Sequence, residues 1–267
     1  MILGLVEGIT EYLPISSTGH LLVAEHLLDV GTSSATEGAA DTYVVTIQAG
    51  AILAVLVLYR HRIGDIVQGL FGRSATGRRV LVALAVAFVP AAVTGLLFDD
   101  LIKDRLLAPV PIAAAWVVGA AAIWFVVPRV RAAHGRPLDE ITLRHAAVIG
   151  GCQVLALWPG TSRSLVTIIA ALAVGLSMMA AVEFSFLLGL LTLTAATFYD
   201  GAKNGGELVD TFGVATPLLG LLVAFVSAVV AVRWMVTYLE RKDLRVFAIY
   251  RVVAAVATIA LLAAGVI

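Results

Sequence analysis

Two clusters of polar side chains interrupt this apolar sequence, and both carry groups that could bind an ion. The first lies in residues 7–20, EGITEYLPISSTGH, which hold two carboxylates, three consecutive hydroxyl side chains and an imidazole. Glu7 and Glu11 are four residues apart, so on a helix they share one face. Two like charges there repel and are costly to desolvate, so a cation or a proton must compensate them. The pair predicts a site for a divalent cation or an exchanging proton, with simple pairing to Arg163 as the structural alternative.

The second cluster is residues 159–164, PGTSRS, which precede another apolar segment. A serine or threonine at such a place is suited to cap a helix. Capping does not explain Arg163, whose guanidinium costs about 2.5–3.5 kcal/mol beside an apolar membrane helix unless it is paired or hydrated. Helix N-termini attract phosphate, and an arginine can add a two-donor contact to it. This cluster therefore predicts an anion site.

Together the two clusters indicate hydrolysis of a bound phosphate and not its transport alone. A phosphate carrier needs helix ends and an arginine, but it does not need His20 three residues after a candidate nucleophile at Ser17. The imidazole could act as a base and then as an acid. We expect Ser17 or a water molecule to attack the phosphorus, with His20 as a further candidate nucleophile.

The elements that must position these clusters are membrane helices. Hydrophobic residues make up 61% of the chain and charged residues 13%, and the mean hydropathy is +1.01. This composition is typical of a polytopic membrane protein and not of a soluble enzyme. The formal net charge is zero, which excludes the basic signature of a nucleic-acid-binding protein. We expect an all-α protein embedded in the lipid bilayer, with no nucleic-acid partner.

Six apolar segments are long enough, or nearly so, to cross the hydrocarbon layer as helices: 41–59, 79–97, 111–127, 180–198, 215–235 and 247–267. Two pairs of shorter stretches do not fit this template. They are 2–13 with 18–29, broken at Pro14, and 143–157 with 165–176, broken at Pro159-Gly160. Such pairs fit re-entrant helical hairpins, which enter and leave the membrane on one side.

The order short, short, long, long, long occurs twice, offset by roughly 140 residues, which indicates an internal repeat. Each half, about 1–130 and about 140–267, contains three crossings. An odd number of crossings inverts the second half relative to the first. The chain, 1–267, is then a single membrane domain. Coincidence among similar apolar helices is the alternative, because the halves share little sequence identity.

Charges in the loops predict the orientation. Loops 60–78, 128–142 and 236–246 fall on one side and carry Arg60, Arg62, Arg73, Arg78, Arg129, Arg131, Arg136, Arg241, Lys242 and Arg245. The opposite loops, 98–110 and 199–214, carry Lys103, Arg105 and Lys203. By the positive-inside rule the cation-rich side is cytoplasmic and both termini lie outside. The first hairpin then enters from outside and the second from the cytoplasm, so that their tips meet near the midplane.

At these residues the chain closely resembles the undecaprenyl pyrophosphate phosphatase family, bacterial membrane enzymes linked to bacitracin resistance. The family's motifs are met by Glu7 and Glu11, by Pro14, Ser16, Ser17, Thr18, Gly19 and His20, and by Pro159, Gly160, Ser162, Arg163, Ser164 and Thr167. The resemblance extends to residues 47–53, 156–158 and 183–188 and covers essentially the whole chain. Leu165 and Leu191 depart from the pattern, since the family usually has glycine and often proline there. The side chain of Leu165 could narrow the phosphate pocket.

The resemblance implies hydrolysis of undecaprenyl pyrophosphate to undecaprenyl phosphate and inorganic phosphate, which recycles the carrier lipid for peptidoglycan synthesis. It also implies an enzyme of the bacterial inner membrane that depends on a divalent cation, Mg²⁺ or Ca²⁺, held by Glu7 and Glu11. Arg163 and the helix ends would hold the non-bridging oxygens. Further candidates for substrate binding are Ser16, Thr18, Gly160, Thr161, Ser162, Ser164 and Thr167. The site is expected to open to the outer face, and a homodimer is compatible with the resemblance.

A secondary transporter or lipid flippase is the main alternative, because inverted repeats with helices broken at the midplane recur in transporters. Transport and hydrolysis could also coexist in one protein. A structural scaffold is a weaker hypothesis, because it leaves Glu7, Glu11 and Arg163 without a role.

Overall fold

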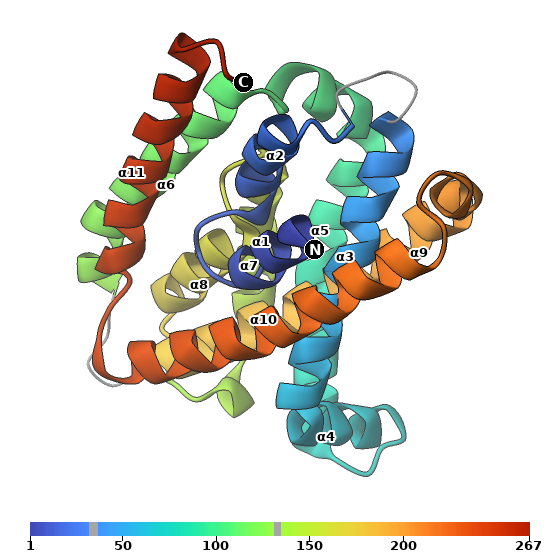
Figure 1. The fold of residues 1–267 in the computed structure, drawn as a ribbon. Helices are drawn as coiled ribbons and strands as arrows, with labels where there is room; N and C mark the ends of the chain where they lie inside the picture. Colours follow the sequence, from blue (N-terminus) through green and yellow to red (C-terminus); the bar gives the residue numbers. More distant parts are fainter. Residues whose placement is uncertain (32–36, 131–134) are drawn as a thin grey trace.

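The computed structural model describes residues 1–31, 37–130 and 135–267, with the side chains of 37, 39, 41, 99, 100, 103 and 200–211 excepted. These residues form helices joined by turns, and no β-sheet occurs among them. Helix α10 crosses α1 and α3 obliquely, and α6 and α11 lie side by side (Figure 1). The helices are α1 (Ile2–Thr10), α2 (Ser17–Leu28), α3 (Glu37–Leu58), α4 (Arg60–Leu70), α5 (Ala75–Leu106), α6 (Pro109–Val130), η1 (Leu138–Glu140), α7 (Leu143–Gln153), η2 (Val154–Leu157), α8 (Arg163–Ala173), α9 (Met178–Phe212), α10 (Ala215–Arg241) and α11 (Arg245–Ala263).

The predicted membrane helices are present. Within the described residues, α5, α6, α9, α10 and α11 are each long and apolar enough to cross a membrane. The sixth predicted crossing lies in α3, which meets the same criterion only together with α4, at a bend of 83°. The loop predicted at 60–78 is wrong in part, because α4 is an amphipathic helix within it. The chain is therefore a multi-pass membrane protein whose described residues form an all-helical structure with five such helices, or six if the bent pair is one crossing.

Each predicted short pair consists of two short helices joined by an irregular turn. Residues 11–16 separate α1 from α2, and residues 158–162 separate η2 from α8. The last residue of each turn is a serine with positive φ, 70° at Ser16 and 73° at Ser162. Such a φ is uncommon and costly outside glycine, so its presence at the same place shows that both turns share one geometry. The direction in which each pair enters the membrane stays a prediction.

Small residues bring α1 close to α10. A Cβ atom at Gly4 would lie 2.4 Å from the carbonyl oxygen of Gly220, and one at Gly8 would lie 2.3 Å from that of Ala224. The two glycines are four residues apart, so they share one face of α1. In a membrane such close backbone packing takes over the role that hydrophobic burial has in water. This contact fixes the helix that carries Glu7.

Arg251, near the middle of α11, connects both turns to α6. Its side chain is fully buried and donates to the backbone carbonyl oxygens of Pro14, Ala115, Trp116 and Gly160, at 2.9–3.2 Å. A buried guanidinium is tolerated only when its N–H groups are paired. Because Pro14 and Gly160 belong to different turns, this one side chain holds the two turns at fixed positions.

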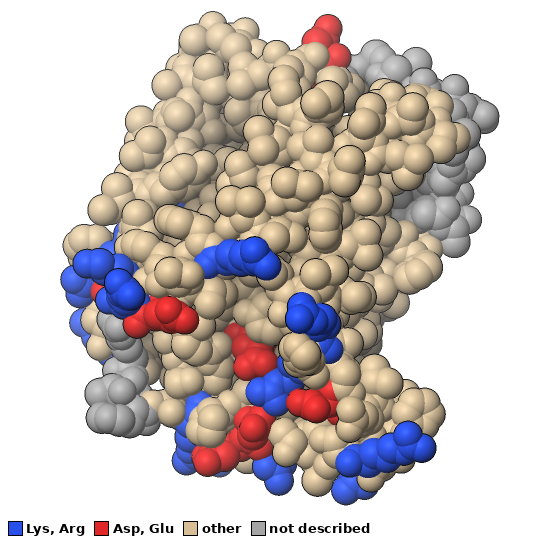
Figure 2. Space-filling view, turned by 60° about the horizontal axis from the view of Figure 1, so that its bottom comes forward, with Lys and Arg blue, Asp and Glu red and all other residues tan. Residues whose placement is uncertain are grey.

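Charged side chains gather at one end of the molecule, around α4 and the neighbouring helix ends (Figure 2). Arg62 of α4 donates from Nε to Glu183 Oε1 at 2.6 Å and from Nη1 to Asp139 Oδ1 at 2.7 Å. These ion pairs fix α4 against η1 and the start of α9. Of the predicted cation-rich side, Arg60 and Arg62 belong to α4, Arg78 belongs to the start of α5, and Arg73 lies in the turn between them. The side chains of Lys103, Arg131 and Lys203 lie outside the described residues.

Replacing Arg251 tests how much the fold depends on its contacts. We expect Arg251→Met to lower the free energy of unfolding by about 2–4 kcal/mol, because four buried carbonyl oxygens lose a charged donor. Thermal unfolding of the purified protein in detergent measures the change. The matched control is Arg245→Met at the exposed start of α11, with an expected effect under about 1 kcal/mol. An equal loss of unfolding free energy in the two variants would contradict a stabilising role for the four hydrogen bonds of Arg251.

Candidate active site

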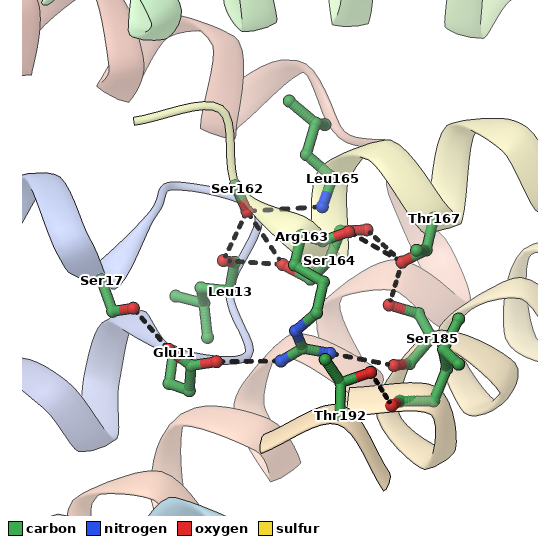
Figure 3. Close-up of polar contacts among 11 residues, drawn as sticks. Glu11, Leu13, Ser17, Ser162, Arg163, Ser164, Leu165, Thr167, Ser185 and Thr192 are labelled. Carbon is green, nitrogen blue, oxygen red and sulfur yellow. Dashed lines mark hydrogen bonds and ion pairs between the residues drawn. The ribbon is translucent and has the colours of Figure 1, made fainter. Parts of the chain in front are cut away.

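An ion pair between Glu11 and Arg163 joins the two turns (Figure 3). Arg163 donates from Nη2 to Glu11 Oε1 at 2.9 Å and from Nη1 to the carbonyl oxygen of Ser185 at 3.3 Å. The two charged side chains are 6% and 11% exposed. Burial of either charge alone is strongly unfavourable, whereas a hydrogen-bonded pair offsets much of that cost. The pairing with Arg163 that the sequence offered as a structural alternative is therefore present at Glu11, and the role of Glu11 in a cation site stays a prediction.

Ser17 contacts the same carboxylate. Its Oγ donates to Glu11 Oε2, the oxygen that Arg163 does not hold. Ser17 is the first residue of α2 and is 7% exposed. A carboxylate that accepts the proton of a serine hydroxyl can act as the base for that serine. Glu11 thus lies between the candidate nucleophile Ser17 and the guanidinium of Arg163.

Hydroxyl groups of the second turn bind the first turn. Ser162 and Ser164 donate to the carbonyl oxygen of Leu13, at 3.5 and 3.0 Å. Further along α8, the Oγ1 atom of Thr167 lies 2.7 Å from the Oγ atom of Ser185 on α9. These bonds hold α8 in place and thereby position Arg163. The predicted roles of Ser164 and Thr167 in substrate binding stay predictions.

A cavity of about 190 Å³ lies beside the ion pair. The starts of α2 and α8 both reach it, so two helix N-termini give it a positive potential. It is smaller than the roughly 300–1,000 Å³ of sites for drug-sized ligands, which suits a polar head group. The predicted site residues that line it are Glu11, Ser16, Ser17, Thr18, Gly160, Ser162 and Arg163.

His20, the predicted base, has hydrogen-bond partners other than Ser17. Its Nδ1 lies 2.6 Å from the carbonyl oxygen of Ser16, and its Nε2 lies 2.8 Å from Tyr250 Oη. A carbonyl oxygen can only accept, so Nδ1 carries a hydrogen. The ring stacks on Tyr250 with centroids 5.5 Å apart, and His20 does not line the cavity. Its role as a base stays a prediction, and this arrangement does not favour it.

Several other predicted residues lie outside the wall of the cavity. They are the predicted cation ligand Glu7 and the candidates for substrate binding Thr161, Ser164 and Thr167. Leu165 is 1% exposed and packs in the hydrophobic core, so it does not narrow the pocket as expected. Leu165 therefore does not form part of the cavity wall.

Glu7 is buried completely, and neither of its carboxylate oxygens has a hydrogen-bond partner within the described residues. An ionised carboxylate in such a place requires a cation, and a neutral one requires a proton. Among the described residues, no group of three or more histidine, cysteine, aspartate or glutamate side chains could enclose a metal ion. The predicted cation site therefore depends on Glu7, with Glu11 one helical turn away.

Three residues that shape the site were not predicted from the sequence. Gly189 makes room for the ion pair, because a Cβ atom there would lie 1.8 Å from Arg163 Nη1. Gln153 lines the cavity, and Arg251 holds both turns. A lone charge in the apolar segment 247–267 was a usable signal for Arg251, and a lone amide in 143–157 was a weaker one for Gln153. Nothing in the sequence singled out Gly189.

The fold and the cavity together define a multi-pass membrane protein with a polar cavity whose wall includes a serine, a carboxylate and an arginine. The family model described as Bacitracin resistance protein BacA matches residues 1–257. The chain therefore belongs to the BacA family.

Similar proteins include several that are named for the same activity. Undecaprenyl-diphosphatase 2 of Rhodospirillum rubrum is 48% identical over 251 residues, which cover 94% of this chain and 89% of that protein. Undecaprenyl-diphosphatase 1 of Chromobacterium violaceum is 44% identical, over 94% of this chain and 91% of its own length. Undecaprenyl-diphosphatase of Sorangium cellulosum is 43% identical, over 94% of this chain and 82% of its own length.

Enlarging Gly189 tests the geometry of the ion pair. We expect Gly189→Ala to lower the thermal stability clearly, because the new methyl group displaces the guanidinium of Arg163 and leaves Glu11 buried without its cation. Thermal unfolding in detergent measures the effect. Gly95→Ala in α5 is the control, since a Cβ atom there meets its nearest neighbour, Leu157, at an ordinary 3.6 Å. Wild-type stability of Gly189→Ala would show that the pair tolerates displacement.

Proposed function

We propose that the chain is an undecaprenyl-diphosphatase of the bacterial inner membrane, which hydrolyses undecaprenyl pyrophosphate to undecaprenyl phosphate and inorganic phosphate. The activity recycles the carrier lipid for peptidoglycan synthesis and gives resistance to bacitracin. Membership of the BacA family and the activity for which the relatives are named support it. One observation about the site carries it: Ser17 donates to Glu11, and Glu11 pairs with Arg163, at the wall of a head-group-sized cavity.

In the proposed reaction Ser17 Oγ attacks the terminal phosphorus, and its proton passes to Glu11 Oε2. The bond from that phosphorus to the bridging oxygen breaks, and undecaprenyl phosphate leaves with the electron pair and takes the proton from Glu11. A water molecule then attacks the phosphoserine and gives a proton to Glu11. That proton returns to Ser17 Oγ as inorganic phosphate leaves. If water attacks directly, Glu11 is the base for the water and Ser17 orients it.

Arg163 and the two helix N-termini are proposed to hold the non-bridging oxygens of the phosphoryl group. A guanidinium can present two parallel N–H groups to phosphate. Fixed donors of this kind lower the barrier because they meet the charge that develops at the phosphorus without reorganising. Arg163 donates to the carbonyl oxygen of Ser185 and to the carboxylate of Glu11, so the position of its guanidinium is fixed before the substrate binds.

A divalent cation, Mg²⁺ or Ca²⁺, fits the unpartnered oxygens of Glu7. Hard cations of this kind prefer carboxylate oxygens, and Glu7 presents two of them in a buried place. Glu11 is the second proposed ligand. When bound, the cation would offset negative charge on the diphosphate. The alternative compensation at Glu7 is a proton.

The topology is proposed to be an inverted repeat with two re-entrant hairpins, α1 with α2 and α7–η2 with α8. Support comes from the matching positive φ of Ser16 and Ser162 and from the convergence of both turns on one cavity. The charged end around α4 is proposed to be cytoplasmic by the positive-inside rule. Both termini and the opening of the site then lie on the outer face.

Phosphate release from a polyprenyl diphosphate by the purified protein in detergent tests the function. We expect release by the wild type and a loss of about 100-fold or more in Arg163→Lys, because an ammonium cannot reproduce the planar two-donor grip. Arg245→Lys at the exposed start of α11 is the matched control and should keep full activity. No release by the wild type would favour the transporter, and full activity in Arg163→Lys would make Arg163 a structural counter-ion only.

The cation site is tested by titrating the same activity with Mg²⁺ or Ca²⁺ after treatment with a chelator. Glu7→Gln should lower the rate and move the midpoint to a higher cation concentration, because the amide removes a charged oxygen ligand. Glu140→Gln, on the exposed η1 helix, should leave the curve unchanged. A lower rate with an unchanged midpoint in Glu7→Gln would point to proton handling at Glu7.

The open side of the site can be tested by labelling. Thr18 lines the cavity and is exposed, so a cysteine placed there in a Cys152→Ser background is accessible from the opening. We expect a membrane-impermeant thiol reagent to label it on intact cells with a permeable outer envelope. Labelling only after the cytoplasmic face is opened would overturn the outward orientation, and labelling from both faces would support alternating access.

A further inference from the structure

Gln153 is the last residue of α7, and it is buried without a partner. It is 2% exposed, and neither the oxygen nor the nitrogen of its carboxamide has a hydrogen-bond partner in the described part of the chain. Buried amides are nearly always paired. The same side chain belongs to the wall of the cavity beside Arg163. What completes its hydrogen bonds is therefore expected to enter through that cavity.

The position of Gln153 corresponds to that of Glu7 in the other hairpin. Each lies nine residues before the serine of positive φ, Ser162 in one case and Ser16 in the other. Both side chains are buried, and both have unpartnered polar atoms. They differ in chemistry, because a carboxylate only accepts hydrogen bonds whereas a carboxamide also donates two. Corresponding places in the two hairpins thus present a carboxyl group in one and a carboxamide in the other.

A purely structural role does not account for Gln153. The hydroxyl groups that hold the hairpins together, such as those of Ser164 and Thr167, have protein partners at 3.0 Å or less. The buried carboxamide of Gln153 has no such protein partner among the described residues. It also carries no charge, so it does not add to the negative charge of Glu11 at the cavity.

We propose that the carboxamide of Gln153 binds the diphosphate head group by donating from its NH₂ group to a non-bridging oxygen. The proposal rests on the proposed function and deepens it, because it adds a further binding residue to the proposed anion site. Gln153 makes this contact in the bound substrate as well as in the transition state. Its loss therefore weakens binding more than it slows the chemical step.

The test compares three variants in the phosphate-release assay. Gln153→Leu removes the donor at similar size, and we expect KM to rise about tenfold or more with kcat within about threefold. Gln153→Glu places a negative charge against the head group and should raise KM further. Gln68→Leu makes the first change on the exposed face of α4 and should leave both constants unchanged. An unchanged KM in the two Gln153 variants overturns the proposal.

A binding measurement separates this proposal from the proposed function. Inorganic pyrophosphate should raise the thermal midpoint of the wild type and of Gln68→Leu, and this rise should be much smaller in Gln153→Leu and Gln153→Glu. If the wild type releases no phosphate, this measurement still decides the role of Gln153. An equal rise in all four proteins overturns it. The midpoint of the cation titration should not move in Gln153→Leu, since a shift would mean that the change disturbs the carboxylates instead.

Discussion

The buried pair of Glu11 and Arg163 is the interaction on which the site depends. The two residues are 152 positions apart, and they meet only if both turns reach the same place. Neither charge is tolerated there alone, so the pair penalises every arrangement of the helices that separates the turns. The fold accommodates it at two points: Gly189 leaves space for the guanidinium, and Ser17 takes the carboxylate oxygen that Arg163 leaves open.

Arg251 adds a second constraint of a different kind. Its acceptors are backbone carbonyl oxygens, so it holds the path of the chain and not the side chains that do chemistry. The two arginines have different roles. Arg163 places a positive charge in the wall of the cavity, whereas Arg251 holds the backbone of the two turns in position. A site held in this way is organised before its ligand binds, which is the condition for electrostatic stabilisation of a transition state.

The sequence predicted the helices well because length and apolar character are local properties. All six long segments and both broken pairs occur as helices, and the two polar clusters meet as expected. Features set by distant contacts were not predictable. The fit of Gly189 against Arg163 and the orientation of His20 toward Tyr250 depend on which helices become neighbours. The helix α4 was missed because its stretch is polar and amphipathic and resembles a loop in hydropathy.

The pairing of Glu11 has a consequence for how an anion can bind. Without a ligand, Arg163 is neutralised by Glu11, so the cavity does not hold a bare cation within the membrane. A diphosphate that approaches Arg163 must share it with a carboxylate, and the two anions repel each other. That repulsion is relieved if Glu11 takes up the proton of Ser17 while Ser17 Oγ bonds to the phosphorus, because the negative charge then passes to the phosphoryl oxygens that face Arg163. The contact between Ser17 and Glu11 would then couple proton transfer to bond formation, so that the proposed nucleophile is activated only when the anion is in place.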